Sequence, residues 1–273
     1  MNRWLQIKLF WHSFFLQAGW NYVRYQNLGF AFVMLPFLRH LYKKDPEIIQ
    51  TVLQRYLDTF NTHPVMASFC YGALAKKEEI IAQATSVADY KERVQEWTGI
   101  RRGLSITAAS IGDRLFWGAL KPLTLLLAIL IWMLQGVNFF ETRDIFPQEF
   151  SSIYMAPVVA FCVYNVIACF VRWQGLRLGY QNDESSCFGL TYFDWNRTIY
   201  HAKRLGLVFA SGLILFGLYR YMAHRDVLDV HFVARSILVL FFVLFSFVTH
   251  RLRIPNVYVY LMSVLIFTIV CSF

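Results

Sequence analysis

The stretch from Gly112 to Pro122 places a carboxylate, two aromatic rings and two glycines at the start of a long apolar run. A carboxylate at the edge of a membrane span is costly to desolvate, so it more often serves a function than a structural need. Asp113 could accept two strong hydrogen bonds from a diol, and Trp117 could stack on a sugar ring. Alternatively, Asp113 caps a helix that begins near Leu115 or pairs with a neighbouring basic residue, and Trp117 belongs to an interfacial aromatic belt.

Three uncharged amides, Gln17, Asn21 and Gln26, stand in an aromatic and apolar setting. If this segment is helical, Gln17 and Asn21 share one face and form a convergent polar pair. Uncharged amides suit a neutral sugar, so all three are candidate ligands. The alternative is that they form hydrogen bonds between helices inside a bundle.

The sequence Asn61-Thr62-His63-Pro64 lies between two predicted helices. Side chains of this kind often satisfy exposed backbone groups at such breaks, and Thr62 could cap the helix that follows. Broken helices at membrane depth can also present polar groups to a substrate, so Asn61 and Thr62 are candidate ligands. His63 is interpreted as a hydrogen-bonded structural histidine rather than a proton carrier.

The composition indicates an integral membrane protein. The chain has 273 residues, of which 57% are hydrophobic and only 16% charged, whereas soluble domains have about 25% charged residues. The net charge of +9 comes mostly from basic residues between apolar runs, so anionic lipid explains it better than nucleic acid. The five cysteines show no metal-binding spacing, and no nucleophile–base constellation points to an enzyme.

Five apolar runs in the C-terminal half are long enough to cross about 30 Å of hydrocarbon. The runs are Phe116–Gly136, Ser152–Val171, Leu205–Met222, Phe232–Thr249 and Asn256–Cys271. Basic loops alternate with acidic ones between these runs, so we expect the basic loops in the cytoplasm and the C-terminus outside. The predicted fold class is therefore an all-α integral membrane protein with about five C-terminal transmembrane helices.

The N-terminal part is predicted to contain helices that do not span. Met1–Phe15 is interpreted as a retained amphipathic helix. Gly29–Leu38 is apolar but too short to span, and we expect Pro36 to interrupt it. Pro46–Phe60 has apolar residues at helical spacing after Asp45 as a possible N-cap, which predicts an amphipathic helix on the membrane surface or against partner helices.

Gly103–Gly112 is short and weakly polar, so we expect it to enter the membrane and return as a re-entrant segment. The charged run Lys76–Glu79 is expected to be a solvated helix end, with a docking surface for a soluble partner as the alternative. Residues 1–114 would then form an amphipathic and re-entrant part, and residues 115–273 a transmembrane part, of one integrated membrane domain.

Four blocks of residues resemble the IID subunit of mannose/fructose/sorbose-type sugar phosphotransferase permeases, in order and spacing, across Phe15 to Tyr180. The blocks are Gln17-Ala18-Gly19-Trp20-Asn21 with Gln26, Gly29, Phe30, Met34 and Pro36; Phe60-Asn61-Thr62-His63-Pro64 with Gly72, Glu78 and Glu79; the Gly112-Asp113 stretch; and Asn165, Arg172, Gly175, Gly179 and Tyr180. The chain departs from the family pattern at His63, usually glutamine, at Arg114, usually proline, and in the approach Leu104–Ile111, which is not glycine-rich.

The resemblance implies a permease subunit that forms a sugar path with a IIC membrane subunit, in oligomers of IIC–IID pairs in the bacterial cytoplasmic membrane. The soluble IIA and IIB subunits of the family carry the phosphorylated histidines, so we expect no catalytic residue, cofactor or metal on this chain. The expected partners are these subunits, a hexose-type sugar and membrane lipid, and not nucleic acid. The altered segment Ser105–Arg114 leaves an alternative, a transport-inactive structural or regulatory membrane protein that retains the fold.

Overall fold

The computed structural model describes residues 1–134 and 150–223, and the chain divides into two compact units, residues 1–213 and 214–273. Only residues 214–223 of the second unit are described, and they are the C-terminal end of α8. The elements are α1 (Arg3–His12), η1 (Ser13–Phe15), α2 (Asn27–Leu41), α3 (Pro46–Tyr56), α4 (Ala67–Ile81), α5 (Val87–Gly112), the π-helical segment η2 (Asp113–Leu120), α6 (Lys121–Leu134), α7 (Phe150–Gln181), η3 (Glu184–Ser186), η4 (Leu190–Tyr192) and α8 (Trp195–Ala223).

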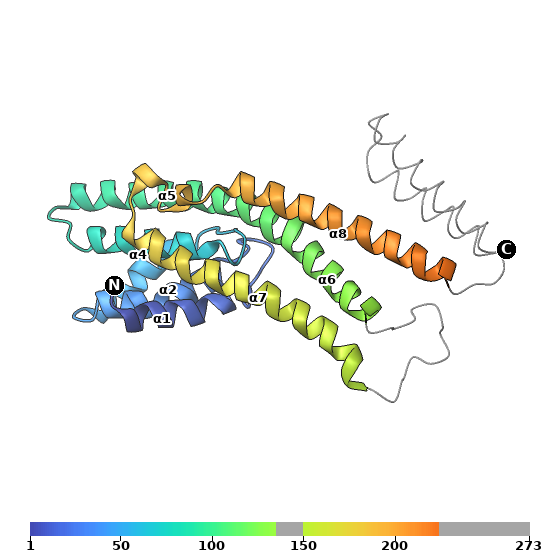
Figure 1. Cartoon of the computed structure of the whole chain (residues 1–273). Helices are drawn as coiled ribbons and strands as arrows, with labels where there is room; N and C mark the ends of the chain where they lie inside the picture. The colour runs from blue at the N-terminus through green and yellow to red at the C-terminus, as the bar shows by residue number, and fades with distance from the viewer. Residues whose placement is uncertain (135–149, 224–273) are drawn as a thin grey trace. The chain divides into compact units, whose positions relative to one another are not determined.

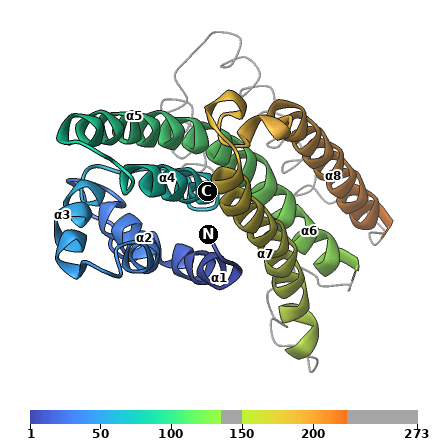
Figure 2. The same ribbon diagram turned by 90° about the vertical axis from the view of Figure 1, so that its left-hand side faces the viewer.

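Helix α4 is the centre of the first unit. It packs between α5 and α7, and α2 also contacts it (Figures 1 and 2). Every residue from Ala67 to Ala75 is buried, as expected for an apolar stretch that is too short to span a bilayer. Gly72 and Gly179 bring α4 and α7 into backbone contact, since a Cβ on Gly72 would overlap the carbonyl of Leu176. Such small residues are typical of helix packing in membranes.

The prediction of a re-entrant segment is wrong. Gly103–Gly112 continues α5, and α5, the π-helical segment and α6 form one unbroken helical run from Val87 to Leu134. The hydroxyls that make the segment weakly polar are satisfied along the helix, because Ser105 and Thr107 donate to carbonyls one turn back. The predicted division at residue 114 falls inside this run.

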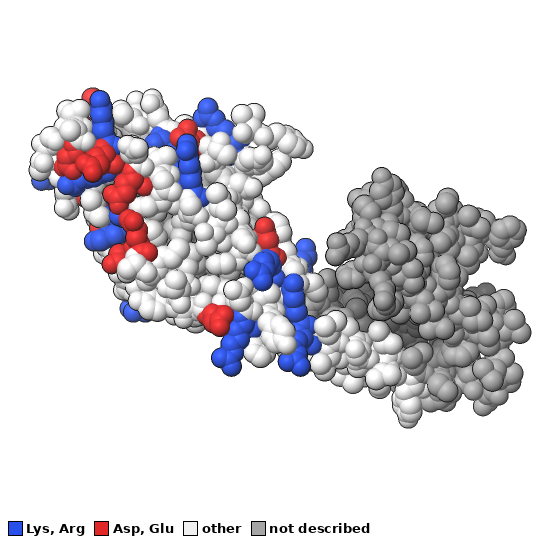
Figure 3. Space-filling model, turned by 90° about the horizontal axis from the view of Figure 1, so that it is seen from above, with Lys and Arg blue, Asp and Glu red and all other residues white. Residues whose placement is uncertain are grey.

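Within residues 1–134 and 150–223, three helical runs are long and apolar enough to cross a membrane: Val87–Leu134, Met155–Gln181 and Trp195–Gly217. They contain or overlap the first three of the five predicted spans, and the all-helical class is confirmed for residues 1–134 and 150–223. The predicted spans Phe232–Thr249 and Asn256–Cys271 lie outside the described residues. Figure 3 shows acidic and basic side chains gathered at the end where α5 begins, with further charged side chains along the same face.

The predicted helices over Met1–Phe15 and Pro46–Phe60 are present as α1 with η1 and as α3, although the Asp45 side chain makes no capping hydrogen bond. Pro36 does not interrupt α2, contrary to our prediction. A proline in a helix leaves the carbonyl four residues earlier without its donor. Here that carbonyl belongs to Phe32, and the ring nitrogen Nδ1 of His12 lies 3.3 Å from it.

The charged run at the end of α4 is not solvated throughout. Glu78 is fully buried, and the hydroxyls of Tyr42 and Tyr56 each donate to its carboxylate at 2.8 Å. Arg55 forms an ion pair with the same carboxylate. Burial and this carboxylate raise the pKa of the Tyr56 hydroxyl, so it remains a donor. The prediction of a solvated helix end is therefore wrong for Glu78, because the side chains of Tyr42, Arg55 and Tyr56 enclose its carboxylate.

Candidate functional site

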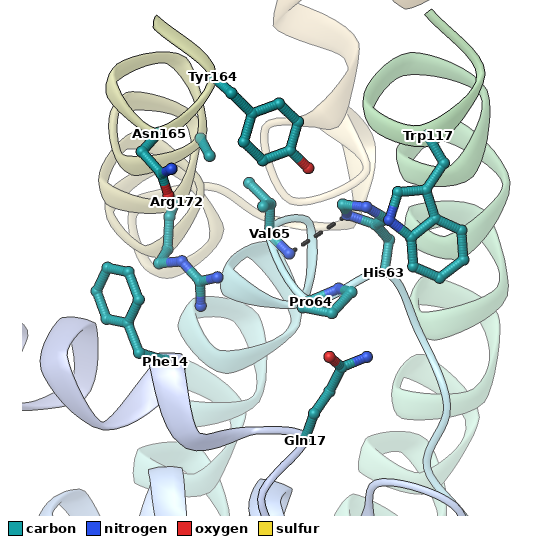
Figure 4. Close-up of a pocket in the computed structure, with 10 residues that line it drawn as sticks. Phe14, Gln17, His63, Pro64, Val65, Trp117, Tyr164, Asn165 and Arg172 are labelled. Atoms are coloured by element: carbon teal, nitrogen blue, oxygen red, sulfur yellow. Dashed lines mark hydrogen bonds between the residues drawn. The ribbon is translucent and has the colours of Figure 1, made fainter. Parts of the chain in front are cut away.

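A cavity of about 220 Å³ lies where four segments of the first unit meet: the turn after η1, the connection between α3 and α4, the π-helical segment and α7. We call it the His63 cavity (Figure 4). Its lining residues are Phe14, Gln17, His63, Pro64, Val65, Trp117, Tyr164, Asn165, Ala168 and Arg172. The lining combines aromatic rings with amides and a guanidinium, and it contains no carboxylate.

The connection that carries His63 is held in place by Gln26. The Gln26 side-chain amide donates to the Thr62 carbonyl at 2.9 Å and accepts from the Thr62 N–H at 3.0 Å. This pair of hydrogen bonds fixes the backbone beside the cavity, as pairing with a neighbouring strand would. On the other side Gly112 allows close approach, because a Cβ at this position would overlap the His63 side chain.

His63 is only 2% exposed and stacks on Phe116, with ring centroids 4.9 Å apart. Its Nδ1 accepts a hydrogen bond from the Val65 N–H at 3.3 Å (Figure 4), so the ring proton resides on Nε2. The Nε2 atom is buried and has no hydrogen-bond partner among the described residues. Burial and, secondarily, the positive charge of Arg172 lower the pKa of His63 to about 4, so the ring is neutral at physiological pH.

Arg172 is a second buried group of the cavity, 7% exposed. One guanidinium nitrogen, Nη1, donates to the carbonyl and the hydroxyl of Ser13 at 2.7 and 2.9 Å. The guanidinium also lies over the Phe14 ring, 4.5 Å from its centroid. Its Nε is buried without a partner, and no ion pair involves Arg172 within residues 1–134 and 150–223. Arg172 thus ties α7 to the N-terminal turn and keeps an uncompensated positive charge.

Two of the predicted ligands, Gln17 and Trp117, line the cavity. Gln17 does not share a helical face with Asn21, because the chain forms turns after η1, and that expectation is wrong. The backbones of Asn21 and Tyr25 instead exchange two hydrogen bonds of 2.9 Å, and the Asn21 side chain donates to Asn27 at 2.8 Å. Asn21 therefore shapes the turn, as Gln26 shapes the next connection.

The other predicted ligands lie outside the lining. Thr62 is buried next to His63 but does not cap α4, which begins at Ala67, and Asn61 is exposed. Asp113 is exposed and has helical backbone angles, so it does not cap a helix that begins near Leu115. No ion pair of Asp113 occurs in the part of the chain that the structure describes. Its role as a sugar ligand stays a prediction.

Our sequence reasoning did not propose Phe14, His63, Tyr164, Asn165 or Arg172 as ligands. For α7 a signal existed, because Asn165, Ala168 and Arg172 are spaced by three and four residues and so share one helical face. No such signal existed for His63, whose contacts come from distant segments. Among the described residues, no group of three metal-binding side chains is present.

The family model for the mannose/fructose/sorbose family IID component of the sugar phosphotransferase system matches residues 3–140, about half of the chain. The chain belongs to this IID family. The match includes the N-terminal turn, the connection with His63 and the π-helical segment, and so three of the four segments that form the cavity.

Three members of the family are similar to this chain in sequence. The chain is 30% identical over 172 residues to the mannose-specific EIID component of Escherichia coli (strain K12), covering 63% of this chain and 53% of that relative. It is 28% identical over 175 residues to the sorbose-specific EIID component of Klebsiella pneumoniae, covering 64% and 56%. It is 28% identical over 172 residues to the fructose permease IID component of Bacillus subtilis (strain 168), covering 63% and 54%. The chain therefore spans about half the length of these curated relatives.

Two solved structures share the fold. One contains the mannose transporter ManYZ in complex with microcin E492, and a chain in it matches with a TM-score of 0.54 and 26% identity. The other, described as a membrane protein, matches with a TM-score of 0.62 and 26% identity. Each match covers 78% of this chain and 70% of the other chain, so the likeness includes most of the described helices.

Proposed function

We propose that this chain is the IID subunit of a mannose-type sugar phosphotransferase permease and forms a sugar path together with a IIC membrane subunit. The observation that carries the proposal is the His63 cavity, which an IID-family sequence builds beside two helical runs able to cross a membrane. Its aromatic and amide lining suits a hexose-type sugar, whose ring can stack while its hydroxyls form hydrogen bonds.

Within this function, Trp117 is the stacking platform and Gln17 and Asn165 are the amide ligands. The Asn165 amide nitrogen already donates to the Phe161 carbonyl at 2.8 Å, which leaves its oxygen as an acceptor. Gln26 and Asn21 act indirectly by holding the walls of the cavity. Asp113, Asn61 and Thr62 are candidate ligands along the path on either side of the cavity.

A IIC subunit would complete the site. The cavity is smaller than the roughly 300–1,000 Å³ that is usual for small-molecule pockets, and Trp117 is half exposed at its edge. Many apolar side chains on α7 and α8 are also exposed, among them Val166, Phe170 and Leu207, and they would contact lipid or the partner. We further propose that the chain crosses the bacterial cytoplasmic membrane several times and forms an oligomer of IIC–IID pairs. The soluble IIA and IIB subunits would phosphorylate the sugar.

The test is sugar uptake by a strain that lacks its own mannose-type permeases. The chain is expressed with the IIC, IIA and IIB subunits from its gene neighbourhood, and uptake of labelled hexoses is measured. We expect uptake that requires this chain and that falls about tenfold in Trp117→Ala, while the control Lys91→Gln behaves as wild type. Lys91 is exposed on α5 and distant in sequence from every cavity segment.

A complete complex that assembles in the membrane but takes up no labelled sugar of any kind would contradict the proposal. That result would favour the transport-inactive alternative. Assembly is measured by co-purification of the chain with the IIC subunit, so a missing partner is distinguished from a missing activity.

A further inference from the structure

Two N–H donors on side chains that line the His63 cavity are buried and have no acceptor among the described residues. They are Nε2 of His63 and Nε of Arg172, and both side chains are more than nine-tenths buried. Figure 4 shows the two side chains on either side of Val65, with the ring of Tyr164 extending toward the space between them. A buried donor without a partner is costly, so a site that keeps two of them is built for a ligand that supplies acceptors.

The cavity also has a positive charge, which, like the two N–H donors, favours a ligand that accepts hydrogen bonds. Arg172 is always protonated, and the only acceptors that the structure gives it are the carbonyl and hydroxyl of Ser13. No Asp or Glu lines the cavity. The nearest predicted carboxylate ligand, Asp113, is exposed and is not among the lining residues. A buried cation without a counter-ion favours binding of an anion.

A neutral sugar can stack on Trp117 and bond to the amides of the lining, but it leaves the positive charge of Arg172 without a counter-ion. Its hydroxyls are donors as well as acceptors, and sites for neutral diols therefore gain from carboxylates that accept. The His63 cavity offers unsatisfied donors and a positive charge instead. Gln17 and Asn165 supply the only amide oxygens at its edge.

We propose that the His63 cavity binds the carboxylate of an acidic monosaccharide of the hexuronate class. Arg172 is the counter-ion of the carboxylate, His63 donates from Nε2 to a ligand oxygen, and Trp117 stacks on the sugar ring. The inference rests on the proposed function, because it names the substrate class of the same site. The small volume of the cavity admits a single sugar ring rather than a longer saccharide.

The experiment compares D-glucuronate with D-glucose and D-galacturonate with D-galactose, pairs that differ only in the group at C6. The full chain is purified with its IIC subunit, and binding is measured by calorimetry at constant ionic strength. We expect each hexuronate to bind at least about tenfold more tightly than its neutral partner, as a charge-assisted hydrogen bond requires. Arg172→Gln should remove this preference and change the affinity for the neutral sugar little.

Because Arg172 also holds the N-terminal turn, a second variant protects the test against misfolding. His63→Phe keeps the ring stack on Phe116 but removes the Nε2 donor and the acceptor of the Val65 N–H, so hexuronate affinity should fall while the complex still folds with a modestly lower thermal unfolding temperature. Inorganic phosphate and vesicles of phosphatidylglycerol are added as competitors. Binding of either one without hexuronate binding would overturn the inference, because the counter-ion of Arg172 would then be a free phosphate or a lipid headgroup.

Equal affinity for hexuronate and neutral sugar would overturn the inference and leave the proposed function standing, because sugars would still bind. Absence of binding and uptake for every sugar would remove both. Hexose uptake in cells decides between these two failures, since it is measured without any hexuronate.

Discussion

The molecule buries charge at two places that differ in how the charge is compensated. At the end of α4, the Glu78 carboxylate receives two tyrosine hydroxyls and the Arg55 guanidinium, all from the chain itself. In the His63 cavity, Arg172 has no carboxylate partner among the described residues and keeps a free N–H. The first site pairs its opposite charges within the chain, although Nε of Arg55 is also buried without a partner among the described residues, whereas the second has a cavity and no carboxylate in its lining.

This difference separates a structural network from a binding site. A closed network needs nothing from solution, so its loss affects folding. An open network keeps donors that can bind a ligand, so its loss affects ligand binding. Both are built from residues with similar burial, which means that burial alone does not identify the functional site.

The largest expected effect comes from breaking the closed network. Glu78→Leu leaves Arg55 and two tyrosine hydroxyls buried without their acceptor, which should cost about 3–5 kcal/mol of the free energy of unfolding. The measurement is chemical unfolding of the purified full chain with its membrane partner. Glu92→Leu, at an exposed position of α5, is the control and should change stability by less than about 0.5 kcal/mol. Equal stabilities of the two variants would show that the network contributes little.

A smaller effect is expected from a methyl group placed against the open site. In Gly112→Ala the new Cβ overlaps His63, so the ring must shift, and overpacking of this kind costs about 1–3 kcal/mol. We expect sugar affinity to fall about tenfold, measured by calorimetry. The matched control is Gly103→Ala on the same helix, where the Cβ meets open space and the helix should gain up to about 1 kcal/mol. Unchanged sugar affinity in Gly112→Ala would mean that the position of His63 does not matter for binding.

The response to pH distinguishes the two sites further. Unfolded His63 titrates near its ordinary pKa of 6.5, whereas the folded protein lowers it to about 4. Between these values the unfolded chain binds more protons, so stability should fall as the pH decreases from 6.5 to 4. Thermal unfolding at pH 7.5 and pH 5 measures the loss, and His63→Gln should reduce it. The same pH dependence in both proteins would assign the loss to other groups.

The smallest effect is expected at Asp113. Its side chain is exposed and outside the cavity, so Asp113→Asn should change affinity at the His63 cavity by less than about twofold. Sugar uptake is measured in parallel. A tenfold or larger loss of uptake with normal protein levels would show that Asp113 contacts sugar elsewhere along the path, as its place beside a span predicts.

The helices that depend on local pattern could be predicted from the sequence. The amphipathic stretch that became α3 and the apolar runs within α6, α7 and α8 follow from periodicity and length. What failed depends on contacts between distant segments. Pro36 lies inside α2, where Nδ1 of the distant His12 is 3.3 Å from the carbonyl that the proline leaves free. Glu78 is buried because three side chains from α3 and the end of α2 converge on it.

The candidate site could be predicted only in part, because it too depends on contacts between distant segments. Trp117 and Gln17 were identified because their residue types suit a sugar wherever they stand. His63 and Arg172 could not be recognised from residue type, because they become candidate ligands only when the fold buries their N–H donors without an acceptor. Gly103–Gly112 was misjudged because weak polarity and glycines are also compatible with a helix whose hydroxyls bond back to its own carbonyls.

The π-helical segment Asp113–Leu120 has a consequence for the geometry of the long helix. Its last turn closes with Lys121 N–H donating to the Phe116 carbonyl, five residues back, so this turn holds one residue more than an α-turn. One residue corresponds to about 100° of rotation about the axis. The side-chain pattern of α6 is therefore shifted by one residue from a regular continuation of α5, and deletion of one residue here would let the run close as a regular α-helix with the side chains of α6 against their present neighbours.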